Sequence, residues 1–69
     1  MAVSKIITLV GVSPVSWEDA TTRVIKEAQV SLRGITRIRV VEFDVKCNPD
    51  NNTIEGFRVK AEVAFKIES

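Results

Sequence analysis

Four basic side chains are the clearest candidates for ligand chemistry in this sequence. They come from two segments in which charged and apolar residues alternate, and they are Arg37, Arg39, Arg58 and Lys60. On neighbouring strands they could line a basic pocket for an anion such as a phosphate, whose oxygens accept paired hydrogen bonds from guanidinium groups. We favour the simpler interpretation, in which they pair across strands with the acidic residues of the same segments, Glu42, Asp44 and Glu62.

The acidic residues allow two interpretations that involve cations. Glu42, Asp44 and Glu62 could meet symmetry-related copies and bind cations where subunits converge. Residues 48–52, with the sequence Asn-Pro-Asp-Asn-Asn, offer oxygen ligands that suit calcium. Their spacing does not match an EF-hand loop, and asparagine-rich stretches are ordinary turn chemistry. We therefore interpret residues 48–52 as a turn and assign no metal ligands.

Composition excludes most catalytic sites. The 69 residues include no histidine and one cysteine, so neither an intrachain disulfide nor a histidine-activated nucleophile can be built. We predict that the protein is not an enzyme and that Cys47 is a small packed hydrophobic residue. Trp17, the only tryptophan, is interpreted as a packing or interface residue rather than a platform for a flat ligand.

The charge distribution argues against extended anionic partners. Ten basic and nine acidic residues are interspersed and give a net charge of +1. This pattern predicts no nucleic-acid partner and no membrane partner, because both require a basic patch or stripe. The apolar stretch near the N-terminus is too short to cross a bilayer and is interpreted as a strand. We expect a soluble, cytoplasmic protein.

Alternation of apolar and charged residues defines the strands. Residues 57–67 alternate throughout, and residues 5–12 are apolar on both faces, with Gly11 marking a bulge or a close backbone approach. In residues 36–47 the apolar positions change parity near Val40-Val41, which predicts a β-bulge. The last two strands then form a hairpin, in which we expect Glu42 opposite Arg58 and an arginine, Arg37 or Arg39, near Glu62.

Residues 16–33 carry a helical pattern. Ser16 and Asp19 form a capping-box-like start, and Gly34 suits the position after the helix end. One side of this segment forms an apolar stripe made of Ala20, Val24, Ala28 and Ser31, with Ile25 and Leu32 beside it. The element order predicts an α+β fold, a three-stranded antiparallel sheet in the order 1-3-2 packed on one helix.

The predicted lengths require more than one subunit. Two strands run to roughly 36–40 Å, whereas the helix reaches only about 27 Å. One helix cannot cover such a ribbon, so we expect an obligate oligomer in which the hairpin packs against neighbouring copies.

Two segments resemble the dodecin family. They are Gly11-Val12-Ser13-Pro14-Val15-Ser16-Trp17-Glu18-Asp19-Ala20 and Val59-Lys60-Ala61-Glu62-Val63-Ala64-Phe65, in the same element order. The resemblance covers nearly the whole chain and implies a single dodecin-like domain over residues 1–69. It also implies β-α-β-β subunits that assemble into a hollow homododecamer, with the helices outside and the sheets facing the cavity.

The resemblance also bears on the ligand. Many dodecins bind flavins through a tryptophan early in the second strand and a glutamine in the third. Alignment places Arg37 and Arg58 at these positions, which removes the stacking surface and the amide. The sequence is closer to the branch that lacks this tryptophan, for which calcium binding is described.

We therefore predict a non-enzymatic, dodecin-like hollow oligomer that binds or sequesters a small ligand or cations. Its candidate ligand-binding residues are Arg37, Glu42 and Arg58. Calcium is the favoured cofactor over flavin, although neither is fixed by these residues. The alternatives are a purely structural shell and a flavin-storage dodecin with an atypical pocket.

Overall fold

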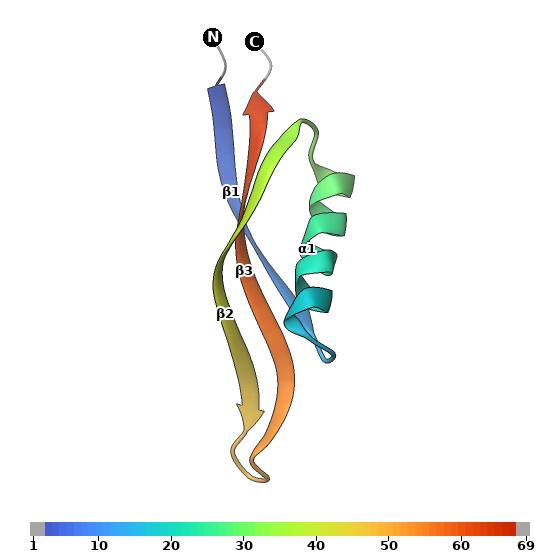
Figure 1. The fold of residues 1–69 in the computed structure, drawn as a ribbon, viewed down its shortest axis with the longest axis vertical. Helices are drawn as coiled ribbons and strands as arrows, with labels where there is room; N and C mark the ends of the chain where they lie inside the picture. The colour runs from blue at the N-terminus through green and yellow to red at the C-terminus, as the bar shows by residue number, and fades with distance from the viewer. Residues whose placement is uncertain (1–2, 68–69) are drawn as a thin grey trace.

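The computed structural model describes residues 3–67, which form one helix and three strands. The elements are β1 (Val3–Ser13), α1 (Trp17–Ser31), β2 (Ile35–Asn48) and β3 (Thr53–Ile67). Both β1 and β2 pair with β3 in antiparallel fashion, so the sheet has the order β1-β3-β2. Figure 1 shows β3 between its two neighbours and α1 beside the sheet. The predicted α+β fold and strand order are confirmed.

Helix α1 starts where the sequence predicts and ends earlier. The Ser16 side chain accepts a hydrogen bond from the backbone N–H of Asp19, which caps the N-terminus. The predicted end at Arg33 is wrong, because Leu32 is already extended and α1 stops at Ser31. Gly34 has a φ of 72° and turns the chain into β2, a conformation that glycine adopts without strain.

The buried core lies between α1 and the middle of β3. Every third or fourth residue of α1 and every second residue of β3 face each other, and the buried apolar residues are Ala20, Val24, Ala28, Val59, Ala61 and Val63. Ser31, which we placed on the apolar stripe, is exposed, because the stripe leaves the sheet at the last turn. β1 approaches α1 closely at Gly11, where an added methyl group would lie 2.5 Å from Val24 Cγ2.

The parity change in β2 is a β-bulge, as predicted. The register shifts between Val40 and Glu42, so Val40 faces Ala61 whereas Phe43 faces Val59. Both flanking stretches of β2 thereby keep their apolar side chains on the side of the sheet that carries the helix. Two further register shifts lie at the ends of β2.

The predicted hairpin register is wrong by two residues. Arg58 lies opposite Asp44 rather than Glu42, and Glu42 lies opposite Lys60. A shift of two residues keeps every side chain on its face, and both registers place an acid opposite Arg58. The prediction that Arg37 or Arg39 lies near Glu62 is confirmed, since Arg39 is its partner.

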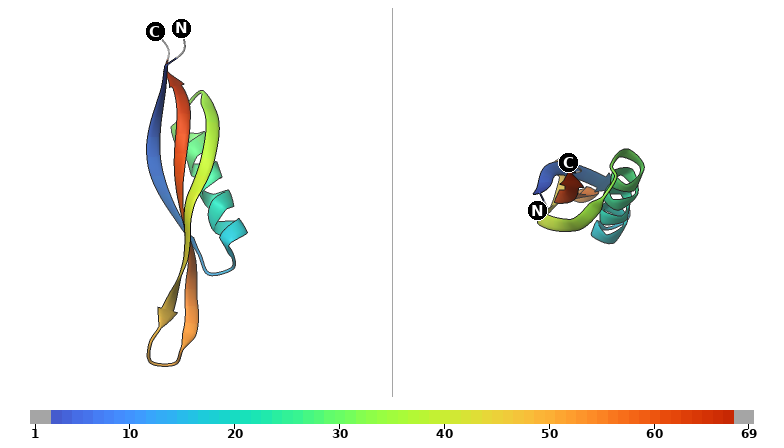
Figure 2. Two further views of the ribbon diagram at one scale, coloured as in Figure 1. Left: turned by 60° about the vertical axis from the view of Figure 1, so that its left-hand side comes forward. Right: turned by 90° about the horizontal axis from the view of Figure 1, so that it is seen from above.

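The sheet is much longer than the helix that covers it. The subunit measures 54 × 18 × 14 Å, whereas the 15 residues of α1 span about 22 Å. Figures 1 and 2 show the β2–β3 hairpin projecting beyond one end of α1 and the outer ends of β1 and β3 beyond the other. No helix in the described part of the chain is long and apolar enough to cross a membrane.

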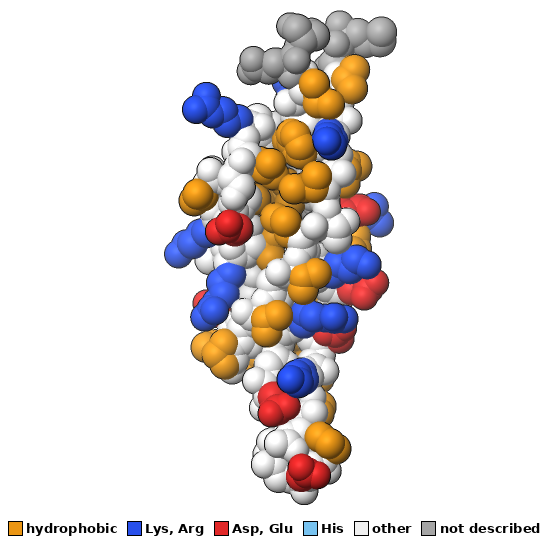
Figure 3. All heavy atoms as spheres, turned by 180° about the vertical axis from the view of Figure 1, so that it is seen from behind, with side chains coloured by type: hydrophobic (Ala, Val, Ile, Leu, Met, Phe, Trp, Pro, Cys, Tyr) orange, Lys and Arg blue, Asp and Glu red, His pale blue; other side chains and the backbone are white. Residues whose placement is uncertain are grey.

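Large apolar side chains remain exposed where the helix does not reach. The exposed fractions of Ile6 and Phe43 are both 59%, and that of Val12 is 55%. In Figure 3, hydrophobic side chains run down the middle of the visible face, with basic and acidic side chains on either side of them. The single subunit therefore leaves much of its apolar surface in water.

Candidate functional site

The side of the sheet that faces away from α1, here called the helix-free face, carries most of the charged residues of the strands. Alternate residues of β3 face this way, because residues 59, 61 and 63 are buried against the helix. Their register partners on β1 and β2 share the face. The helix-free face thus consists of Ile6, Thr8, Val10, Val12, Arg37, Arg39, Glu42, Asp44, Lys46, Arg58, Lys60, Glu62, Ala64 and Lys66.

Three acid–base pairs cross the helix-free face between β2 and β3. Arg58 donates from Nε to Asp44 Oδ1 at 2.8 Å and from Nη2 to the second carboxylate oxygen. Lys60 and Glu42 lie 3.7 Å apart, and Arg39 and Glu62 lie 3.8 Å apart. Each pair joins residues that are directly opposite in the register. The interpretation of these charges as cross-strand pairs is therefore confirmed for three of the basic residues.

The Arg58–Asp44 pair is the tightest of the three. The hydrogen bonds to Asp44, together with its charge and that of Glu42, raise the pKa of Arg58. About half of each side chain is exposed, so water and salt screen the attraction. The pair neutralises Arg58 on this face and fixes the plane of its guanidinium.

The structure does not bring the three predicted ligand-binding residues into one pocket. Arg58 lines a groove of about 360 Å³ with Val12, Asp44, Val45, Lys46 and Gly56. Arg37 lies opposite Ala64, six residues from Arg58 along β3, or roughly 20 Å. Glu42 lies between them and is paired with Lys60. Sequence reasoning missed Ile6 and Lys46 as pocket residues, although the alternation of β1 and β2 could have placed both on this face.

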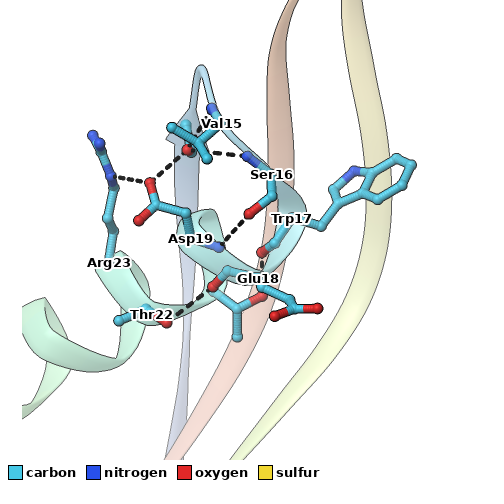
Figure 4. A network of polar contacts seen from close by, with 9 residues as sticks. Val15, Ser16, Trp17, Glu18, Asp19, Thr22 and Arg23 are labelled. Carbon is cyan, nitrogen blue, oxygen red and sulfur yellow. Dashed lines mark hydrogen bonds and ion pairs between the residues drawn. The ribbon is translucent and has the colours of Figure 1, made fainter.

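A polar network fixes the start of α1 next to the sheet (Figure 4). The fully buried hydroxyl of Ser13 donates to Asp19 Oδ2 at 2.5 Å and accepts from the backbone N–H of Val15 at 3.0 Å. Arg23 Nε donates to the same Asp19 oxygen at 2.9 Å. The pKa of Asp19 is lowered mainly by the hydrogen bond from Ser13. Arg23 lowers it further, whereas partial burial of the carboxylate raises it.

Trp17 packs at the junction of α1 with the hairpin. Its ring meets Phe57 edge-on at a centroid distance of 5.3 Å and Phe43 at 6.1 Å. The indole N–H donates to the backbone oxygen of Asp44 at 3.1 Å. The side chain is 40% exposed, which agrees with its interpretation as a packing or interface residue.

The comparisons with known proteins agree on one family. The dodecin family profile matches residues 3–68. The calcium dodecin of Mycobacterium tuberculosis is 36% identical over 67 residues, which cover 97% of this chain and 92% of that protein. The chain belongs to the dodecin family. Dodecins are small-ligand-binding proteins and not enzymes, in agreement with the prediction.

Solved dodecins have the same fold as this dodecin. The calcium dodecin of M. tuberculosis, described as calcium-chelating, superimposes with a TM-score of 0.81 at 36% identity, covering 96% of this chain and 91% of that one. A single-site arginine-to-alanine variant of the Thermus thermophilus dodecin gives a TM-score of 0.87 at 26% identity over the whole of both chains.

The hairpin tip of this dodecin is built as a turn. Asn48 Oδ1 accepts from the backbone N–H of Asp50 at 2.9 Å, and Asn51 Oδ1 accepts from the hydroxyl of Thr53 at 2.6 Å. Within residues 3–67, no three His, Cys, Asp or Glu side chains are grouped so that they could hold a metal ion. The prediction of a packed Cys47 is wrong for the single subunit, because this residue lies on the projecting part of the hairpin and is exposed.

Proposed function

We propose that this dodecin forms a closed shell of identical subunits that binds a small ligand or cations on its helix-free face and catalyses no reaction. The observation that carries the proposal is the mismatch between sheet and helix, which leaves Phe43 and Ile54 of the β2–β3 hairpin more than half exposed in one subunit. A domain of this size has little core of its own and gains further burial by packing against other copies. Membership of the dodecin family supports a homododecamer.

Similarity to a calcium-binding relative favours calcium as the ligand. The calcium dodecin of M. tuberculosis is 36% identical to this chain. Glu42 and Asp44 offer the carboxylate oxygens that calcium takes as ligands. Because each of them already contacts a basic side chain, calcium must displace that contact or combine carboxylates from several subunits.

Native mass spectrometry of the untagged protein, followed by calorimetric titration, tests the proposal. We expect a mass of twelve subunits and saturable heats with calcium chloride, weakened by Glu42→Gln. The matched control is Glu27→Gln, which makes the same change on the exposed side of α1. A monomer or dimer would contradict the shell. An assembled shell that binds neither calcium nor riboflavin would leave only the purely structural alternative.

We also propose that the shell stores its ligand in the cytoplasm. Fractionation of cells that produce the chain, with detection by an antibody, should recover it in the cytosolic fraction. Recovery with membranes would contradict this localisation.

A further inference from the structure

A small pocket on the helix-free face is built by two successive rungs of the sheet. In the first rung Ile6, Ala64 and Arg37 lie side by side on β1, β3 and β2, and in the second Glu62 lies opposite Arg39. The five side chains enclose about 170 Å³. All five residues come from the same subunit, on two adjacent rungs of its sheet.

The charges in this pocket are not balanced. Arg39 contacts Glu62 at 3.8 Å, a long and weak pair in which 74% of the arginine side chain is exposed. Arg37 makes no ion pair and no hydrogen bond with the other residues that the structure describes. The pocket therefore contains two guanidinium groups and one carboxylate. Two other rungs of the helix-free face differ, since Asp44 neutralises Arg58 and Glu42 lies beside Lys60.

The remaining wall of the pocket is apolar. Ile6 is 59% exposed, and its neighbour across the strand pair is the small residue Ala64. A ligand that places an apolar group here removes the Ile6 side chain from water, which favours binding. The pocket thus combines a cationic side on β2 with an apolar side on β1.

We infer that this pocket binds a small organic anion, with a phosphate or carboxylate group on Arg37 and Arg39 and an apolar body on Ile6 and Ala64. The inference rests on the proposed function, in which the helix-free face binds the ligand. Guanidinium groups bind both kinds of oxyanion through paired hydrogen bonds. A volume of about 170 Å³ is below the usual range for drug-sized ligands, so the pocket suits an anionic group with one small ring.

Cations are disfavoured in the same pocket. Calcium takes six to eight oxygen ligands, several of them carboxylates, whereas this pocket supplies the single carboxylate of Glu62 between two positive groups. The pocket at Arg37 is therefore distinct in its ligand class from the carboxylates proposed for calcium.

Calorimetric titration of the native assembly with phenyl phosphate and with benzoate tests the inference and separates the two anion classes. Benzyl alcohol serves as the neutral ring, and inorganic phosphate as the anion without a ring. We expect at least one of the two ring-bearing anions to bind saturably and more tightly than either control. Loss of a charged hydrogen-bond donor should weaken its binding about tenfold in Arg37→Gln.

Two further variants test whether anion binding depends on the charges inside the pocket. Arg33→Gln removes an exposed arginine from the turn between α1 and β2 and should leave anion binding unchanged. Glu62→Gln removes the only carboxylate of the pocket and should strengthen anion binding. Equal binding by wild type and Arg37→Gln, or weaker binding by Glu62→Gln, would overturn the inference.

The outcomes separate this inference from the proposed function. A twelve-subunit shell that binds calcium but neither ring-bearing anion leaves the proposed function intact and refutes the anion pocket. A chain that binds an anion through Arg37 but stays monomeric refutes the shell and supports the pocket, since one subunit contains all of its residues.

Discussion

Substituting Gly11 by alanine should strongly destabilise the subunit. A methyl group on Gly11 would lie 2.5 Å from Val24 Cγ2 and 2.6 Å from the backbone oxygen of Ala20. The valine methyl can move only into a packed core, and the carbonyl is held in the helix, so β1 and α1 must separate. Overpacking of this kind costs about 1–3 kcal/mol, and we expect the upper end here because the obstacle includes backbone. The melting temperature should fall by roughly 10–20 °C.

Guanidinium denaturation and thermal melting, followed by circular dichroism at fixed subunit concentration, measure this effect. Gly56→Ala is the matched control, because its methyl group would meet Val12 Cγ1 at 3.6 Å and Ser13 O at 3.7 Å, which is ordinary contact distance. We expect Gly56→Ala to change stability by less than about 1 kcal/mol. If Gly11→Ala were no more destabilising than Gly56→Ala, the close packing of β1 on α1 would be refuted.

Two predictions concern charged groups. Arg58→Gln and Asp44→Asn should each destabilise the assembly slightly, and their effects should be non-additive, with a coupling that 1 M NaCl removes. Arg58→Gln and Glu42→Gln should couple more weakly, because Glu42 acts on Arg58 only through its charge. Additivity of the first pair would contradict the observed register. The pKa of Asp19 is lowered from its ordinary value of 3.8, so its stabilising effect is present above about pH 4 and is lost as the pH falls through the folded-state pKa. The difference in melting temperature between wild type and Asp19→Asn should therefore shrink from pH 5 to pH 3, with Glu18→Gln as the control for a first-turn charge; a constant difference would contradict the Ser13–Asp19 interaction.

The sequence predicts those parts of the fold that follow from local pattern. Alternation in residues 57–67 identifies the central strand, and the parity change at Val40-Val41 identifies the bulge that the register confirms. The Ser16 cap could be predicted because a serine three residues before Asp19 can accept a hydrogen bond from a backbone N–H of the first helical turn. These features depend on residues close in sequence and on the spacing of apolar residues, and both can be read from the sequence alone.

The register and the site could not be predicted in the same way. In the predicted register Arg58 lies opposite Glu42, and in the observed one it lies opposite Asp44. Both registers place Arg58 on the same face of the sheet and opposite an acidic residue, so neither alternation nor charge can distinguish them. The correct register depends on the hairpin tip and on the shift at Lys46-Cys47, where side chains of Asn48 and Asn51 bind the backbone. The pocket at Arg37 needs Ile6 from a strand about thirty residues earlier, and only the assembled sheet brings them together.

The strand order has a consequence for synthesis of the chain. In the described sheet, β1 and β2 hydrogen-bond to β3 and not to each other, and β3 is the last of the three to be translated. Until residues 53–67 have left the ribosome, the earlier strands have no pairing partner, and a helix of 15 residues is marginal without a sheet to pack on. The nascent chain therefore exposes the apolar side chains of β1 and β2 throughout most of its elongation. Its cooperative folding therefore begins only when the ribosome has released β3.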